Sequence, residues 1–240
     1  MSSTHRGAER RPADFYETPA WCVHRLLEAL PLPGGLWFEP CAGDGAIIKA
    51  VNEVRDDVSW HAHELRDECD LALHGIARVE HVEIGDLLAR PTFPSAKVAI
   101  TNPPFSLAKE MVEHLINGDF EHLIMLQRLN WCGAERADLF RELKPSVYVL
   151  PDRPSFTGGG SDSIEYGWWV FDGEGKLRIL KDTPDAVRRE EKKRAAAKSV
   201  APVPMTLHGV GSRPLHILGT PHEHTHDRES YCTVCQDETT

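Results

Sequence analysis

Short apolar runs alternate with amphipathic stretches over residues 1 to about 180. Such runs, bounded by turn residues, are typical of strands, and apolar positions spaced three and four apart are typical of helices. We expect strands at residues 36–41, 58–65, 79–85, 97–102, 122–127, 146–151 and 166–171, and helices at 19–30, 45–55, 106–117 and 133–143. Several strands are too apolar to have a solvated face, which favours a mostly parallel seven-stranded α/β sheet with helices on both faces and right-handed crossovers.

The first helix has a recognisable beginning at Thr18 and Pro19. A threonine hydroxyl can cap the first turn, and a proline loses nothing there because its missing N–H would have no partner. We therefore expect Thr18 to be the N-cap.

The residue composition of the chain changes near residue 184. One folded domain is expected at residues 14–184, after a flexible N-terminus at 1–13. Residues 185–205 are a charged helical run and a proline-rich linker, in which a basic arm on a duplex is one interpretation and a solvated helix with Glu-Lys pairs is another. Residues 206–240 contain too few apolar side chains for a core of their own and are expected to be poorly ordered.

Composition narrows the class of protein. The chain has 240 residues and a formal net charge of −10, which argues against a protein that coats nucleic acid non-specifically through many basic side chains. It does not exclude an enzyme that meets DNA through one basic face. The six scattered cysteines, the absence of a long apolar run and an N-terminus without a signal sequence predict a reduced, cytoplasmic protein with no membrane span.

The segment FEPCAGDGAI places an acidic residue at a strand end, then a tight turn at Gly43 and Gly45, then a helix. It lacks the third glycine of a dinucleotide fingerprint and the Gly-Lys-Ser/Thr ending of a phosphate loop. Carboxylates on both sides of the turn, from Glu39 and Asp44, would repel a pyrophosphate and suit a ligand with an ammonium and a sulfonium, such as S-adenosylmethionine. The alternative is a tight strand-to-helix loop with no ligand.

Two more acidic residues end the next two expected strands. Glu64 could accept hydrogen bonds from ribose hydroxyls, and Asp86 could reach an adenine edge. Each alone could equally be a solvated charge at a strand end. The carboxyl ends of parallel strands form the ligand-binding edge of such sheets, so their joint placement favours a cofactor site.

The fourth strand ends in the segment Thr101-Asn102-Pro103-Pro104-Phe105. The two prolines fix the backbone, so the Asn102 amide oxygen and the carbonyl of Pro103 can face one space. Two such acceptors can bind both N–H groups of a planar amine and make its lone pair more nucleophilic. Phe105 offers a ring on which an extruded base can stack. The alternative is a proline turn in which the asparagine caps the next helix.

These motifs resemble a known family. EPCAGDG followed about sixty residues later by TNPPF, together with DFYETPAW and RPSFTGGGSDSIEYGWWVF, is similar to S-adenosylmethionine-dependent amino-methyltransferases, in particular phage-type DNA N6-adenine methyltransferases, over residues 14–172. The resemblance implies a Rossmann-like methyltransferase fold whose seventh strand is antiparallel. It also implies a phage or bacterial restriction-modification setting, in the host cytoplasm.

The resemblance assigns roles to particular residues. It implies catalytic roles for Asn102, Pro103, Pro104 and Phe105. It implies cofactor contacts for Tyr16, Thr18, Pro19, Glu39, Cys41, Gly43, Gly45, Glu64 and Asp86. Asn at the first motif position and Phe at the last differ from the commonest adenine pattern and also resemble RNA and protein-glutamine methyltransferases. These acceptors remain the first alternative, and a catalytically silent binding module with the cofactor fold is the second.

Two sets of residues remain as candidate ligands. Recognition of a DNA substrate is expected in the two long loops, where the candidate substrate-binding residues are Arg128, Asn130, Arg136 and Arg153; ordinary surface charge is the alternative. In the tail, two thiolates and two of three nearby imidazoles could hold a structural zinc ion, although the histidine spacing is unlike a zinc finger and a disordered tail with incidental ligands is the alternative. These residues are His222, His224, His226, Cys232 and Cys235. The oligomeric state is left open.

Overall fold

A computed structural model describes residues 17–156 and 163–182, all of which belong to one unit of the chain, residues 1–199. Its strands are β1 Gly35–Glu39, β2 Val58–Glu64, β3 Val79–Ile84, β4 Val98–Thr101, β5 His122–Arg128, β6 Ser146–Val149, β7 Tyr166–Val170 and β8 Leu177–Ile179. Its α-helices are α1 Ala20–Ala29, α2 Ala46–Asn52, α3 Asp70–His74, α4 Ala108–Leu115 and α5 Ala137–Leu143. Short 3₁₀ turns are η2 Asp67–Cys69, η3 Leu87–Ala89, η4 Leu129–Trp131 and η5 Ala134–Arg136.

The strands form one sheet in the order β3-β2-β1-β4-β5-β7-β6-β8. Only β7 runs against its neighbours β5 and β6, and all other pairs are parallel. The seven predicted strands are all present, and the antiparallel seventh strand is confirmed. The sheet has eight strands, because β8 pairs with β6 at the edge; its side chains are exposed, so it carries no burial pattern that the sequence could reveal.

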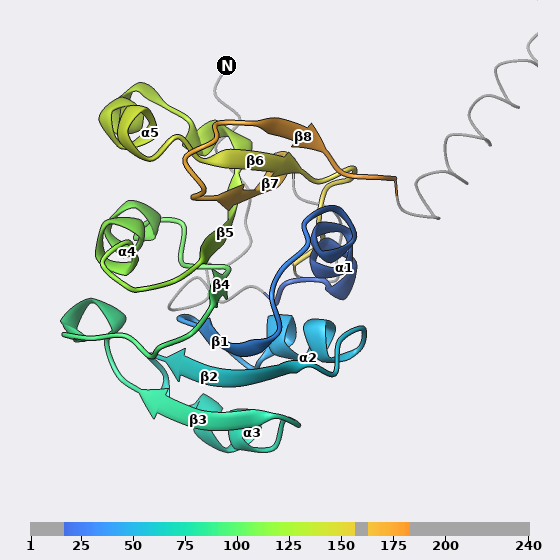
Figure 1. The fold of residues 1–240 in the computed structure, drawn as a ribbon, viewed down its shortest axis with the longest axis vertical. Helices are drawn as coiled ribbons and strands as arrows, with labels where there is room; N and C mark the ends of the chain where they lie inside the picture. The colour runs from blue at the N-terminus through green and yellow to red at the C-terminus, as the bar shows by residue number, and fades with distance from the viewer. Residues whose placement is uncertain (1–16, 157–162, 183–240) are drawn as a thin grey trace, which may run out of the picture. The chain divides into compact units, whose positions relative to one another are not determined.

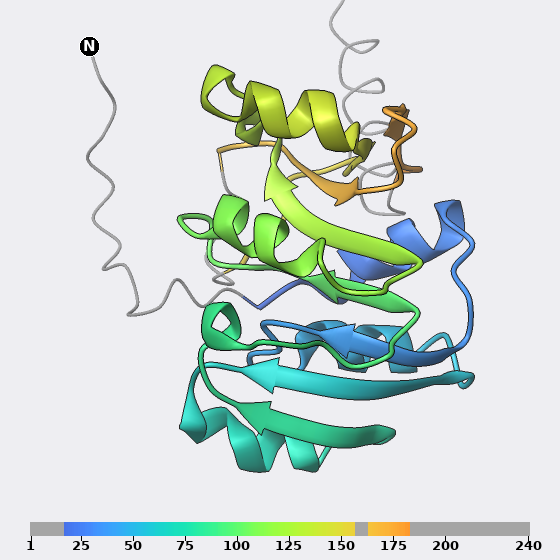
Figure 2. The ribbon, with the colours of Figure 1, turned by 60° about the vertical axis from the view of Figure 1, so that its left-hand side comes forward.

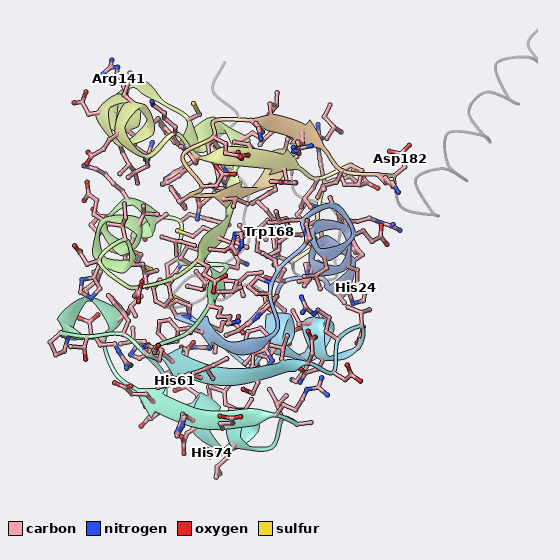
Figure 3. The ribbon with its side chains drawn as sticks, in the orientation of Figure 1. His24, His61, His74, Arg141, Trp168 and Asp182 are labelled. Carbon is pink, nitrogen blue, oxygen red and sulfur yellow. The ribbon has the colours of Figure 1, made fainter. Side chains whose placement is uncertain are left out.

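Helices cover both faces of the sheet, as expected (Figures 1 and 2). On one face, side chains of α1, α2 and α3 pack against β1, β2 and β7. Trp168 points from β7 toward α1, where its indole N–H donates to the Cys22 carbonyl at 2.9 Å (Figure 3). On the other face, α4 packs against Phe38 and Met125, and α5 joins it beside Trp169. Burial on both faces explains why the central strands are nearly all apolar.

The helices differ from the sequence prediction at their ends. The helix predicted from residue 133 begins as the 3₁₀ turn η5 before α5, and α3 was not predicted at all because it is a single short turn. The predicted N-cap role of Thr18 is wrong: Pro19 is the N-cap of α1, and no side chain caps it. The longest described helix has 10 residues, so none in the described ranges has the length of a membrane span.

The glycine turn before α2 imposes a local constraint on the chain. Gly45 has φ +76°, and a Cβ there would lie 2.1 Å from the Ile76 side chain. We predict that Gly45→Ala lowers the free energy of unfolding by about 1–3 kcal/mol, because a left-handed backbone and a displaced side chain both cost energy. Chemical denaturation measures this.

Gly85→Ala is the matched control, since a Cβ at Gly85 has no atom within 4 Å and its φ is not positive in the left-handed range. It should change the free energy of unfolding by less than about 0.5 kcal/mol. Equal effects of the two variants would contradict this view of the turn.

Candidate functional site

The candidate site lies where the strand order reverses. β1 pairs with β2 on one side and with β4 on the other, and chain connections leave the carboxyl ends of these strands in opposite directions. Open α/β sheets bind ligands in the crevice outside such strand ends. Glu39 is the last residue of β1, and Asn102 directly follows the neighbouring parallel strand β4, so the two predicted motifs stand side by side at one edge of the sheet.

The glycine turn is fastened to the end of β2. The Gly43 N–H donates to Glu64 Oε2 at 2.6 Å, and the Ala42 N–H donates to the His63 carbonyl at 2.9 Å. Gly43 and Gly45 both have positive φ, which allows the backbone to turn sharply into α2. The turn is therefore held open by a carboxylate from the neighbouring strand.

Glu39 is a buried carboxylate with an unsatisfied oxygen. Its side chain is 2% exposed, and Oε2 has no hydrogen-bond partner among the described residues. Burial, reinforced by the negative charge of Glu64, raises the pKa of Glu39 well above its usual range, although the Ile48 N–H donates to it. A buried carboxylate in this condition is a place where a cationic ligand group would be stabilised.

The other two predicted carboxylates already have protein partners. Glu64 Oε1 accepts hydrogen bonds from the backbone N–H and the side-chain Nε of Arg66, at 3.1 and 2.9 Å. With the Gly43 bond this makes three, and a carboxylate accepts about four. Asp86 is exposed and accepts from the Leu88 N–H at 3.0 Å, which caps η3. Glu64 is the last residue of β2 and Asp86 lies two residues after β3, so both stand at the carboxyl ends of neighbouring parallel strands.

The Asn102 side chain contacts a residue far away in sequence. Its Nδ2 donates to the hydroxyl of Thr18 at 3.0 Å, and Thr18 is only 5% exposed. This bond orients the Asn102 amide and places the predicted Thr-Pro segment, including Pro19, beside the end of β4. The alternative role of Asn102 as a helix cap is wrong, because α4 has Leu107 as its N-cap and no side-chain cap bond.

Phe105 belongs to a cluster of rings and one cation, and the buried Pro103 and half-buried Pro104 lead into it. The guanidinium carbon of Arg128 lies 4.4 Å from the Phe105 ring centroid, and Arg128 Nε donates to the Tyr166 hydroxyl at 3.2 Å. The Phe105 and Tyr166 centroids are 5.8 Å apart. Phe156 meets Tyr166 edge-on at 5.1 Å.

Cys41 lies in the glycine turn but is unsuited to nucleophilic chemistry. Burial raises the pKa of its thiol to about 12, and nearby Glu64 and Glu39 contribute in the same direction. Its Sγ instead contacts Met111 Sδ at 3.7 Å. Because the thiolate is the nucleophile, a covalent cysteine intermediate at this position is disfavoured.

The remaining predicted recognition residues are exposed or contact other groups than the Phe105 ring. Asn130 is exposed on η4, and Arg136 donates to the Trp131 carbonyl at 3.2 Å beside that indole ring. Arg153 is exposed and forms an ion pair with Glu165 at 2.6 Å. The structure therefore brings only Arg128 of this group to the Phe105 ring.

Some predicted ligands lie outside the described residues. They are Tyr16, His222, His224, His226, Cys232 and Cys235. Within the described ranges, no group of three or more His, Cys, Asp or Glu side chains is arranged to hold a metal ion. The proposed zinc site in the tail stays a prediction.

Sequence reasoning missed three residues of the site. Arg66 balances the charge of Glu64, the Tyr166 ring lies beside Phe105, and the Phe156 ring packs against Tyr166. Tyr166 and Phe156 were quoted in the late segment that resembles the family but were given no role. The signal for Arg66 was a basic residue two positions after Glu64, since residues i and i+2 of an extended chain lie on the same side.

Comparison with known proteins supports the fold. No protein family and no curated protein matches the sequence. PH1948 from Pyrococcus horikoshii, named as a candidate RNA methyltransferase, aligns with a TM-score of 0.50 and 15% identity over 66% of this chain and 86% of its own. The 23S rRNA methyltransferase ErmE gives 0.48 and 13%, over 78% of this chain and 80% of its own. A modification subunit of a candidate type I restriction enzyme from Vibrio vulnificus YJ016 gives 0.47 and 14%, over 80% and 55%.

The strand order, the antiparallel β7 and the match to PH1948 together define the class of fold. The chain has a Rossmann-like methyltransferase fold.

The burial of Glu39 predicts a pH-dependent cost. Because its pKa is raised in the folded state, the native protein favours the protonated form, and stability falls as pH rises from about 4.3, the usual pKa, through the raised value. Glu39→Gln removes the ionisable group, so we expect it to melt at a higher temperature than the wild type at pH 8. The two should converge near pH 4.

Glu80→Gln, the same change at an exposed position of β3, is the control and should follow the wild type throughout. Parallel melting curves for wild type and Glu39→Gln across this pH range would contradict the buried charge.

Proposed function

We propose that this protein transfers a methyl group from S-adenosylmethionine to the exocyclic N6 amine of adenine in DNA, with the base flipped out of the duplex. One observation carries the proposal: the Asn102 amide, held by Thr18, stands at the same sheet edge as the buried carboxylate of Glu39. An oriented acceptor for an amine thus lies next to a site for a cationic donor.

The residues of the glycine turn fit the proposed cofactor. Glu39 Oε2 has no partner among the described residues, so an ammonium or sulfonium would supply the missing interaction. Gly43, Gly45 and Cys41 would line its methionine end, and Tyr16, Thr18 and Pro19 would cover it. Glu64 would use its remaining lone pair for the ribose, and Asp86 would lie near the adenine.

S-adenosylmethionine, when bound, supplies an electrophilic methyl group on a positively charged sulfur. The Asn102 oxygen and the Pro103 carbonyl would accept the two N–H groups of the target amine and aim its lone pair at that carbon. In the proposed transfer the amine nitrogen would bond to that carbon as the carbon–sulfur bond broke with its electron pair left on sulfur, and the amine would then lose one proton to solvent. The raised pKa of Cys41 agrees with direct transfer, without a covalent enzyme intermediate.

Adenine in DNA is preferred as the acceptor because EPCAGDG, TNPPF and the late aromatic segment together resemble phage-type DNA N6-adenine methyltransferases. The Phe105 ring suits a planar base. RNA or a protein glutamine is the alternative acceptor, and a silent binding module with the cofactor fold is the other.

Acceptor identity is tested with radiolabelled S-adenosylmethionine and separate DNA, RNA and protein acceptors. We expect label in DNA only, and single-molecule sequencing of DNA from cells expressing the protein should show N6-methyladenine in a defined sequence context. Label in RNA or protein would support the alternative enzyme. Cofactor binding by calorimetry without transfer to any acceptor would support the silent module.

Two variants should separate chemistry from cofactor binding. Asn102→Ala should reduce kcat by about a hundredfold or more, because the amine loses its oriented acceptor, while cofactor affinity stays near wild type. Glu39→Gln should weaken cofactor affinity by about tenfold, because it removes a charge-assisted contact. Calorimetry and single-turnover rates measure the two effects. Unchanged turnover in Asn102→Ala would remove its catalytic assignment.

The hydroxyl of Thr18 should matter through Asn102. Thr18→Val keeps the shape of the side chain but removes the acceptor for Asn102 Nδ2, so we expect kcat to fall by about three- to tenfold. Thr18→Ser keeps the hydroxyl and should remain close to wild type. Equal reductions of kcat in Thr18→Ser and Thr18→Val would show that the hydrogen bond from Asn102 to Thr18 does not support catalysis.

A further inference from the structure

Arg128 occupies the place beside Phe105 that a stacked base would need. Its guanidinium carbon lies 4.4 Å from the ring centroid. Stacked or tilted aromatic partners have centroids about 4.5–7 Å apart, so no second ring fits between the guanidinium and Phe105. A base that stacks on this face must displace Arg128.

The Arg128 side chain is held in place by a hydrogen bond to the buried Tyr166. Its Nε donates to the hydroxyl of Tyr166, whose side chain is fully buried and paired in β7 beside β5. Arg128 itself is only half-buried, at the carboxyl end of β5. The anchor is rigid, whereas the arginine has a long side chain that can leave it.

The chemistry of guanidinium suits two alternating partners. It is planar and cationic, so it stacks on an aromatic ring, and it also binds phosphate oxygens through paired N–H groups. Stacking uses the face of the group and phosphate binding uses the N–H groups at its edge, so one arginine can serve either partner. A nucleic acid can therefore offer Arg128 a phosphate in exchange for the ring that its base takes.

We propose that Arg128 is a removable cover of the Phe105 ring: it stacks there while no acceptor is present and moves to a backbone phosphate when an adenine enters. This inference rests on the proposed function for the identity of the base. It assigns Arg128 a positioning role, in which the enzyme exposes its stacking surface only to a base that arrives with its phosphates.

The proposal makes opposite predictions for two ligands. Adenosine has a base but no phosphate, so Arg128→Ala should bind it about three- to tenfold more tightly than the wild type, because nothing has to be displaced. A mixed-sequence DNA duplex should bind Arg128→Ala about three- to tenfold more weakly. The slope of log affinity against log salt should also fall by about 0.9, for one lost phosphate contact.

Arg128→Lys separates the two roles. Lysine keeps the charge but lacks the planar group and the Nε donor, so its duplex affinity and salt slope should resemble wild type, whereas its adenosine affinity should rise as in Arg128→Ala. Arg178→Ala is the matched control, because Arg178 also lies over a ring, Tyr148, but on the edge strand β8. It should leave both affinities unchanged.

Calorimetry with adenosine and fluorescence anisotropy with labelled duplex, both on the full chain, measure these affinities, and thermal melting checks that each variant folds. Adenosine affinity that is unchanged or lowered in Arg128→Ala would overturn the proposal, as would an unchanged salt slope. Failure of the proposed function is a separate result, namely wild-type protein that transfers no methyl group to DNA, RNA or protein.

Discussion

The hydrogen bond from Asn102 to Thr18 is the interaction on which the candidate site depends. It joins the segment that precedes α1 to the end of β4, across 84 residues of sequence, and fixes which way an otherwise rotatable amide faces. Prolines on both sides, Pro19 and Pro103, limit the backbone around each partner. A single neutral hydrogen bond can therefore fix the orientation of the Asn102 amide, because the backbone on both sides of the bond is already restricted.

The carboxylates at the carboxyl edge of the sheet are stabilised by backbone N–H groups as well as by an arginine side chain. Parallel strands deliver Glu39 and Glu64 to one place, where two carboxylates would repel each other. Glu64 is stabilised by Arg66 and by the Gly43 N–H, whereas within the described ranges Glu39 accepts from the Ile48 N–H and its Oε2 has no partner. Glu64 therefore supports the glycine turn, whereas Glu39 has a carboxylate oxygen that can still accept a ligand. For this reason we propose a cationic ligand group next to Glu39.

The sequence could predict the central strands and the two motifs because their cause is local: buried apolar runs, glycines at a turn and prolines after a strand. It could not predict β8 or α3, which are short and are set by tertiary pairing. It misplaced the role of Thr18, since a capping residue and a long-range acceptor look the same in sequence. The sequence could not show that Phe105, Arg128 and Tyr166 form a cluster, because they come from the segment after β4, from β5 and from β7 and meet only in the folded chain.

The antiparallel direction of β7 has a consequence for how such a protein can diversify. β7 runs antiparallel to β5 and β6, so β6 ends and β7 begins at the sheet edge where β1 and β4 also end, and the connection between them joins no two strands of the parallel core from β1 to β5. Doubling a loop costs only about 0.6 kcal/mol of closure entropy. Under the proposed function, insertions there would change the acceptor side of the site and leave the glycine turn and Glu39 unchanged.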